Sequence, residues 1–293
     1  MPLWQIGILA VIQGLAELLP VSSSAHVIVA QRLLGLDPGA PEMTFLLVML
    51  HTGTMLAVLA YFWPRWRERL GLAASPSGAS GDFSFLTMIV IATAWTGVLG
   101  LGLKFTIERL ILEKLLGHSH GEVEHLFRNV PLMASALAAA GMLIVVAGHR
   151  DDRPGKAPLS GRAASAIGIV QAACLPFRGF SRSGATISAA LLCGLPRALG
   201  EDFSFALAVV LTPPVIFLEL RRLIRSAGLQ GPAGASLAAL TLPGLLGMIG
   251  SFVAGLIALR WLSAWLEQGR WRCFGYYCLF FAALVFLGYL LGL

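Results

Sequence analysis

The sequence predicts an all-α polytopic membrane protein with about six spanning helices plus two re-entrant helical hairpins in an inverted-topology repeat. Three observations lead to this fold class. The 293 residues are 57% hydrophobic and only 12% charged, whereas a typical soluble domain carries about 25% charged residues. Six apolar runs are long enough, or nearly so, to cross a bilayer core of about 30 Å. Two further apolar stretches are interrupted by polar residues and resemble each other.

The six expected spans place the whole chain, residues 1–293, in one transmembrane domain. They are residues 44–63, 83–103, 130–147, 203–218, 236–259 and 274–293. The fourth span is marginal because Pro213 and Pro214 interrupt it. Prolines are tolerated inside a span when neighbouring helices or waters satisfy the freed carbonyl groups.

The two interrupted stretches predict re-entrant hairpins at about residues 3–36 and 163–195. The first breaks at Pro20 and the three serines that follow it, and the second breaks between Pro176 and Gly184. The apolar halves on either side of each break are too short to span comfortably. Irregular backbone at membrane depth is allowed only where protein or a wet cavity covers it.

The two breaks also align with each other at an offset of 159 residues, and the aligned pairs include Ser22 with Ser181 and Gly35 with Gly194. Three predicted spans separate the breaks, and an odd number reverses the orientation of the second copy. We therefore expect inverted repeats at about residues 1–147 and 148–293. Such repeats place a site near the bilayer midplane, where the broken helices meet.

The basic residues set the expected orientation. They cluster at 65–69 in one predicted loop and at 150–162 in another, and both loops fall on the same side. Because cytoplasmic loops are enriched in Lys and Arg, we expect that side to be cytoplasmic, although the arginines within 221–225 would then lie outside. The first hairpin then opens outward, towards the side of both termini.

A carboxylate precedes the first break. Gln13 and Glu17 are four residues apart, so they share one face of the helix. An ionisable group inside a membrane is a functional-site hypothesis by default. The alternative is a structural carboxylate that pairs with an arginine.

Hydroxyl groups and a histidine follow the first break. If a helix restarts after Pro20, then Ser22, Ser23 and Ser24 cap its N-terminus, which is a ready anion site. His26 has a side chain suited to general acid or base chemistry near neutral pH. The alternatives are that the serines only cap the helix and that the histidine is merely hydrogen-bonded.

The second break supplies a cation and more donors. Arg182 offers a planar fork of donors that suits phosphate oxygens, and Gly179 and Gly184 allow close backbone approach. Further hydroxyl donors come from Ser181, Ser183 and Thr186. Together the two breaks hold what phosphoryl transfer needs, namely charge neutralisation, positioning, a nucleophile and a proton carrier. A structural pairing of Arg182 with Glu17 is compatible with this chemistry.

Other polar residues carry weaker signals. His51 lies within a predicted span and is a candidate for a supporting position near the site. The histidines within 118–125 could point to a metal, but a solvated loop is the favoured interpretation. The net charge of +6 is modest and spread over short loops, so there is no nucleic-acid footprint.

At these motifs the sequence resembles the undecaprenyl-diphosphate phosphatase family, also called the bacitracin-resistance family. The family signatures are (E/Q)-x-x-x-E followed by P-V-S-S-[ST]-[GA]-H, and P-G-x-S-R-S-x-x-T. The first reads here Gln13-Gly-Leu-Ala-Glu17 and then Pro20-Val-Ser-Ser-Ser-Ala-His26. The second reads Arg178-Gly-Phe-Ser-Arg-Ser-Gly-Ala-Thr186. The likeness runs along most of the chain.

The resemblance implies an enzyme of the bacterial inner membrane that removes one phosphate from the C55 lipid diphosphate. This reaction recycles the lipid carrier for cell-wall synthesis and confers bacitracin resistance. The resemblance makes Arg182 the diphosphate clamp, His26 the acid, base or nucleophile helper, and Ser23 a candidate nucleophile. It also implies a divalent cation, Mg²⁺ or Ca²⁺, near Glu17 and Gln13. Which residue attacks stays open.

Two positions depart from or limit the family pattern. Arg178 stands where the family has proline, which adds a cation beside the phosphate loop. Gln13 stays within the motif but removes one carboxylate that could bind a metal. The metal stoichiometry, the exact substrate and the assembly state, a homodimer included, therefore stay open.

The main alternative is a polyprenyl-phosphate lipid transporter or an ion transporter, because inverted repeats with broken helices at the midplane are also a transporter architecture. In that case Glu17 and Arg182 would bind and release a lipid phosphate without breaking it. A bifunctional enzyme that also moves its product lipid is a third possibility. Release of inorganic phosphate separates the first two.

Overall fold

The computed structural model describes residues 1–292 apart from 38–39, 72–82, 108–128, 151–154 and 229–232. These described residues form α-helices and no β-strand. The helices are α1 (Leu3–Leu18), α2 (Ser23–Leu33), α3 (Pro41–Arg69), α4 (Phe83–Thr106), α5 (Val130–Arg150), α6 (Gly161–Cys174), α7 (Arg182–Leu192), α8 (Arg197–Gly228), α9 (Ala233–Glu267) and α10 (Trp271–Leu290). The expected all-α fold class is confirmed.

Six of these helices, α3, α4, α5, α8, α9 and α10, are long and apolar enough to cross a membrane. This agrees with the number of spans expected from the sequence, although most run past the predicted ends. Helix α8 continues through Pro213 and Pro214, so the marginal fourth span is an uninterrupted helix. Helix α3 continues to Arg69. The arginines at 65–69 therefore lie in its last turns, and their expected placement in a loop is wrong.

The breaks between the short helices follow from local sequence. Leu19 is extended, with φ −69° and ψ 149°, because a following proline disfavours the helical conformation of the residue before it. The side chain of Ser181 caps α7 by accepting a hydrogen bond from the Gly184 N–H at 3.3 Å. Ser22 makes no side-chain capping bond to α2, so the expected capping role of this serine is wrong.

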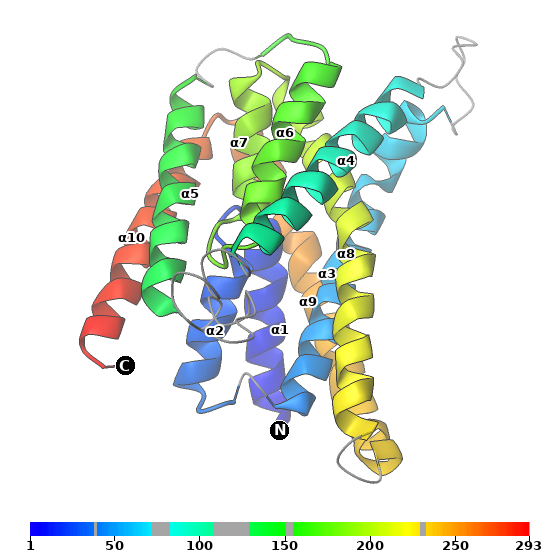
Figure 1. Ribbon diagram of the computed structural model, residues 1–293, viewed down its shortest axis with the longest axis vertical. Coiled ribbons are helices and arrows are strands. Elements are labelled where there is room, and N and C mark those ends of the chain that lie inside the picture. Colours follow the sequence, from blue (N-terminus) through cyan, green and yellow to red (C-terminus); the bar gives the residue numbers. More distant parts are fainter. Residues whose placement is uncertain (38–39, 72–82, 108–128, 151–154, 229–232, 293) are drawn as a thin grey trace.

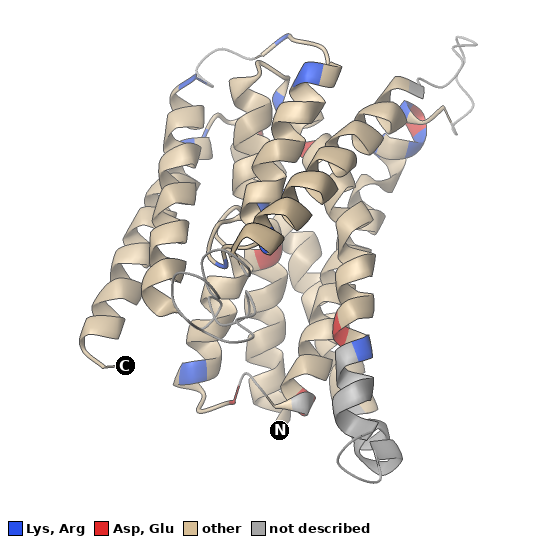
Figure 2. Cartoon of the chain, viewed as in Figure 1, with Lys and Arg blue, Asp and Glu red and all other residues tan. Residues whose placement is uncertain are grey.

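Helices α1 and α2 form one antiparallel pair, and α6 and α7 form another (Figure 1). The two pairs enter the bundle from opposite ends, and their connecting loops meet about halfway along it. Both termini lie towards the same end of the molecule. Charged residues concentrate towards the two ends, with a small group in the middle of the bundle (Figure 2). We refer to these pairs as the first and the second hairpin.

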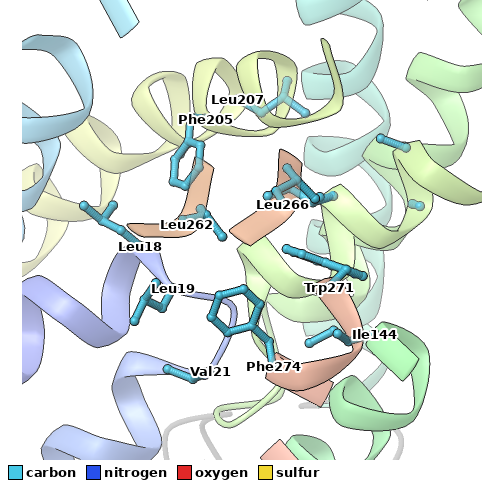
Figure 3. Packing of buried hydrophobic residues seen from close by; sticks show 14 of the residues in the cluster. Leu18, Leu19, Val21, Ile144, Phe205, Leu207, Leu262, Leu266, Trp271 and Phe274 are labelled. Carbon is cyan, nitrogen blue, oxygen red and sulfur yellow. The ribbon is translucent and has the colours of Figure 1, made fainter. Parts of the chain in front are cut away.

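The longer helices surround the hairpins. Helix α9 packs against α1 and α3, α10 packs against α5, and α4 packs against α6. Buried side chains at the first hairpin tip, Leu18, Leu19 and Val21, lie beside Leu262 of α9 and Phe274 of α10 (Figure 3). Because the hydrophobic effect does not drive helices together within lipid, membrane helices associate through close packing. This packing fixes the position of the first hairpin tip.

Small residues mark the closest helix crossings, as in α4 with α6. A Cβ atom added at Gly168 would lie 2.8 Å from Cα and 2.9 Å from the carbonyl carbon of Ala92. We expect Gly168→Ala to lower the free energy of unfolding by about 1–3 kcal/mol, because both backbones would have to separate. Gly97→Ala is the control, since a Cβ at Gly97 meets nothing within 4 Å. Denaturant unfolding in detergent measures both, and equal stabilities would contradict this account of the crossing.

A second charged cluster joins α3, α8 and α9 away from the hairpin tips. Asp202 is fully buried and accepts hydrogen bonds on Oδ2 from Arg69 Nε at 2.9 Å and Arg69 NH2 at 2.6 Å. Arg65 NH1 lies 3.3 Å from Asp202 Oδ1 and 3.4 Å from Glu201 Oε2. Ser263 donates to Glu201 Oε1 at 2.5 Å. Both buried carboxylates are therefore matched by donors.

Candidate active site

A cavity of about 110 Å³ lies between the two hairpin tips. Its lining comes only from the two hairpins, namely Ala16, Glu17, Ser22, Ser23, Ser24, Phe180, Ser181, Arg182 and Ser183. Segments more than 150 residues apart in the chain thus form one small polar chamber inside an apolar bundle. Seven of the residues that the sequence singled out line it.

Glu17 is the centre of the polar contacts in this cavity. Its Oε2 accepts a hydrogen bond from Ser23 Oγ at 2.5 Å and from Gln13 Nε2 at 3.1 Å. Its Oε1 lies 3.2 Å from Arg182 NH2, and His51 Nε2 lies 3.8 Å from Oε2. The Glu17 side chain is only 18% exposed, and a carboxylate shielded from solvent to this extent needs such partners. The pairing of Glu17 with Arg182 that the sequence left open is thus present.

The first hairpin tip carries an unusual backbone conformation. Ser22 has φ 67° and ψ 95°, and it is the only non-glycine residue with positive φ in the described part of the chain. Such a conformation costs about 1–3 kcal/mol and persists only when surrounding contacts over-determine it. The Ser22 carbonyl oxygen is 2.8 Å from His26 Nδ1, and Ser22 Oγ is 3.3 Å from Ser24 Oγ. These contacts hold the turn that sets Ser23 against Glu17.

Two hydrogen bonds join the tips directly. The Gly179 N–H donates to Ser24 Oγ at 3.3 Å, and Ser183 Oγ donates to the Leu19 carbonyl oxygen at 3.3 Å. Gly179 has φ +100°, and a Cβ there would collide with the backbone of Met133 in α5. Both the backbone conformation and the space require glycine at this position. The second tip is thereby fixed against the first.

The cavity lining does not include Gln13, which lies behind Glu17, nor His26, Gly179 and Thr186. Thr186 is fully buried, and its hydroxyl donates to the Arg182 carbonyl oxygen at 2.8 Å and lies 2.5 Å from Ser204 Oγ. His26 faces Tyr277, and Gly179 serves through its backbone. Their contacts position the two tips, while a direct contact with substrate stays a prediction for each.

Two contributors were weak or absent in the sequence analysis. His51 was held only as a supporting candidate, on the signal of a histidine within an apolar span, and the structure places it beside Glu17. Phe180 lines the cavity and was not selected, although it lies inside the second motif. No sequence pattern pointed to Tyr277.

The donor set fits a divalent cation only in part. Among the described residues, no group of three or more His, Cys, Asp and Glu side chains is arranged to hold a metal ion. The cavity does offer hard oxygen donors, the Glu17 carboxylate and the serine hydroxyls. Mg²⁺ is commonly bound by one or two carboxylates together with substrate phosphates. A cation that a diphosphate helps to hold is compatible with this set. The histidines within 118–125 lie outside the described residues.

The regions of the chain that match known proteins include both hairpins. Residues 6–284 match the family described as bacitracin resistance protein BacA. The chain is 54% identical over 286 residues to undecaprenyl-diphosphatase 2 of Acinetobacter baylyi, with 97% of each chain covered. It is 35% identical to undecaprenyl-diphosphatase of Desulfosudis oleivorans, over 92% of this chain and 93% of that one. It is 33% identical to undecaprenyl-diphosphatase 1 of Burkholderia pseudomallei, over 99% and 97%.

Proposed function

The chain belongs to the bacitracin resistance protein BacA family, and we propose that it hydrolyses undecaprenyl diphosphate to undecaprenyl phosphate and inorganic phosphate. One observation carries this proposal. A carboxylate, a serine hydroxyl and an arginine meet around Glu17 in a cavity inside the apolar bundle. A lipid diphosphate can enter such a cavity with its headgroup while its tail stays in the bilayer. The reaction recycles the lipid carrier and accounts for bacitracin resistance.

Ser23 is the proposed nucleophile. Its hydroxyl donates to Glu17 Oε2, which is the arrangement of a nucleophile with its general base. In the first step Glu17 takes the Ser23 proton, Ser23 Oγ bonds to the terminal phosphorus, and the phosphoanhydride bond breaks; Glu17 then gives the proton to the departing undecaprenyl phosphate. In the second step Glu17 takes a proton from a water whose oxygen bonds to the phosphorus, the bond between phosphorus and Ser23 Oγ breaks, and the proton returns from Glu17 to Ser23 as inorganic phosphate leaves.

Arg182 is the proposed clamp for the diphosphate. Its guanidinium lines the cavity and reaches Glu17 with one nitrogen, which leaves further donors of the fork for phosphate oxygens. Charge that develops on these oxygens in the transition state is stabilised most strongly where water is scarce. The hydroxyls of Ser22, Ser24, Ser181 and Ser183 supply additional donors around the same space.

The proposed cation, Mg²⁺ or Ca²⁺, would be held by Glu17 and the substrate phosphates, with Gln13 beside them, and would neutralise phosphate charge. Gln13 is buried and directs its amide nitrogen at Glu17, so its contribution is to orient the carboxylate. The chain's own residues perform the proton transfer and the positioning described above.

We further propose that both hairpins are re-entrant and that they form an inverted repeat in the bacterial inner membrane. The opposite directions of the two hairpins and the placement of both termini at one end support this topology (Figure 1). The basic residues at 65–69, at the end of α3, and at 150–162 favour a cavity that opens to the periplasmic side through the first hairpin.

The decisive experiment measures phosphate release from undecaprenyl diphosphate by purified protein in detergent, with Mg²⁺, Ca²⁺ or a chelator. We expect release by the native chain and a loss of about 10²-fold or more in Glu17→Gln, because the general base is removed. Glu42→Gln is the control, since it makes the same chemical change at an exposed position of α3. Substrate binding without phosphate release by folded protein would instead support the transporter.

A further inference from the structure

The His26 ring is held on three sides. Its Nδ1 lies 2.8 Å from the Ser22 carbonyl oxygen, and its Nε2 lies 2.7 Å from the Tyr277 hydroxyl. The ring stacks on Phe281 with a centroid distance of 4.0 Å and an interplanar angle of 10°. Tyr277 and Phe281 both belong to α10, 251 or more residues along the chain from His26.

These contacts define the proton positions on the ring. A carbonyl oxygen only accepts hydrogen bonds, so Nδ1 must carry a proton. In the neutral imidazole the other nitrogen is then an acceptor, and the Tyr277 hydroxyl donates to Nε2. Neither nitrogen is directed at the cavity, whose lining does not include His26. In this arrangement both ring nitrogens are engaged outside the cavity, so the ring is placed to support the first hairpin tip.

What the ring supports is the strained turn of the first hairpin tip. Ser22, whose carbonyl oxygen accepts a hydrogen bond from the His26 Nδ1–H, has the positive φ of 67° and directly precedes Ser23. A small rotation of the Ser22 peptide would move Ser23 Oγ away from its 2.5 Å contact with Glu17. Misplacement of a reacting group by about 1 Å can cost about 10²-fold in rate. The orientation of His26 thus bears on the geometry of the proposed nucleophile.

We propose that Tyr277 is a positioning residue for this reaction, which acts through His26 on the turn that carries Ser23. The proposal rests on the proposed function for its kinetic consequence, but the hydrogen bond itself can be tested without turnover. Helix α10 contributes no residue to the cavity lining. Under this proposal it nevertheless helps to align the nucleophile.

The kinetic test is Tyr277→Phe, which removes only the hydroxyl. We expect kcat for phosphate release to fall about five- to tenfold, the worth of one hydrogen bond, with KM nearly unchanged because the cavity lining is intact. Tyr276→Phe is the matched control, since its ring is 54% exposed and points about 100° away around the helix. In a His26→Ala background, Tyr277→Phe should have no further effect, because residues in one network are not additive.

The second arm is independent of turnover. In protein labelled with ¹⁵N-histidine, the His26 Nε2 resonance should report an unprotonated nitrogen that accepts a hydrogen bond. It should move in Tyr277→Phe and stay unchanged in Tyr276→Phe, with assignment from His26→Ala. An unmoved Nε2 resonance overturns the proposal, as does a kinetic loss that persists in the His26→Ala background. Absence of phosphate release from the native chain would reject the proposed function, while the resonance would still decide whether Tyr277 sets the His26 ring.

Discussion

Arg182→Ala is expected to lower the rate of phosphate release by about 10²–10³-fold or more, because the diphosphate loses the guanidinium that offsets its charge in a cavity inside the apolar bundle. Arg182→Lys should recover only part of the rate, since an ammonium group is a point charge without the planar fork. The measurement is kcat and KM for phosphate release from undecaprenyl diphosphate. Near-native kinetics in Arg182→Ala would remove this residue from the reaction.

Loss of Arg182 also leaves the Glu17 carboxylate without its ion-pair partner, so the variant needs a folding control. The double variant Arg182→Ala with Glu17→Gln removes both charges, and it should regain stability but not turnover. Arg162→Ala is the matched arginine control, because Arg162 is an exposed residue at the far end of the same hairpin. If the double variant were as unstable as Arg182→Ala, a merely structural role for the pair would explain the loss of rate.

Arg69→Leu is expected to destabilise the protein by about 3 kcal/mol, because both hydrogen bonds to Asp202 Oδ2 disappear and a buried carboxylate loses part of its charge compensation. Denaturant unfolding in detergent gives the free energy. Arg67→Leu is the control, since Arg67 is exposed in the same turn of α3. The turnover per folded molecule should stay near native in both.

A second substitution that removes the Asp202 charge tests whether Arg69→Leu destabilises the protein through the uncompensated carboxylate or through lost packing. Adding Asp202→Asn to Arg69→Leu should restore much of the stability, because the uncompensated charge is then gone. A double variant at least as unstable as Arg69→Leu would show that the arginine acts through its packing over the Phe85 ring of α4.

The fold was largely predictable from the sequence because membrane helices can be recognised by the length and the apolar composition of their segments. The all-α class is confirmed, the described residues contain six helices long and apolar enough to span, and the resemblance to the bacitracin-resistance family is confirmed as well. The ends of the spans were predicted less well. Helix α3 carries Arg65 and Arg69 past the apolar run, because their charges are neutralised by Asp202 and Glu201 of α8, which hydropathy alone does not register.

The site was predictable where it depends on short motifs and unpredictable where it depends on distant packing. The sequence selected Glu17, Ser23 and Arg182, and the structure brings them together. It did not select Tyr277, because nothing in a local pattern links α10 to His26. The strain at Ser22 was equally hidden, since serine has no preference for a positive φ. Such features follow from the assembled bundle and not from propensity.

The separation of Glu17 and Arg182 by 165 residues has a consequence for biogenesis. At a synthesis rate of about 5–20 residues per second, the carboxylate would be made roughly 10–30 s before its arginine. During that interval the nascent first hairpin can rely only on neighbours made at nearly the same moment. Gln13 and Ser23, four and six residues away, can donate to Glu17 at once. Their hydrogen bonds can therefore stabilise the nascent carboxylate during insertion, before Arg182 has been synthesised.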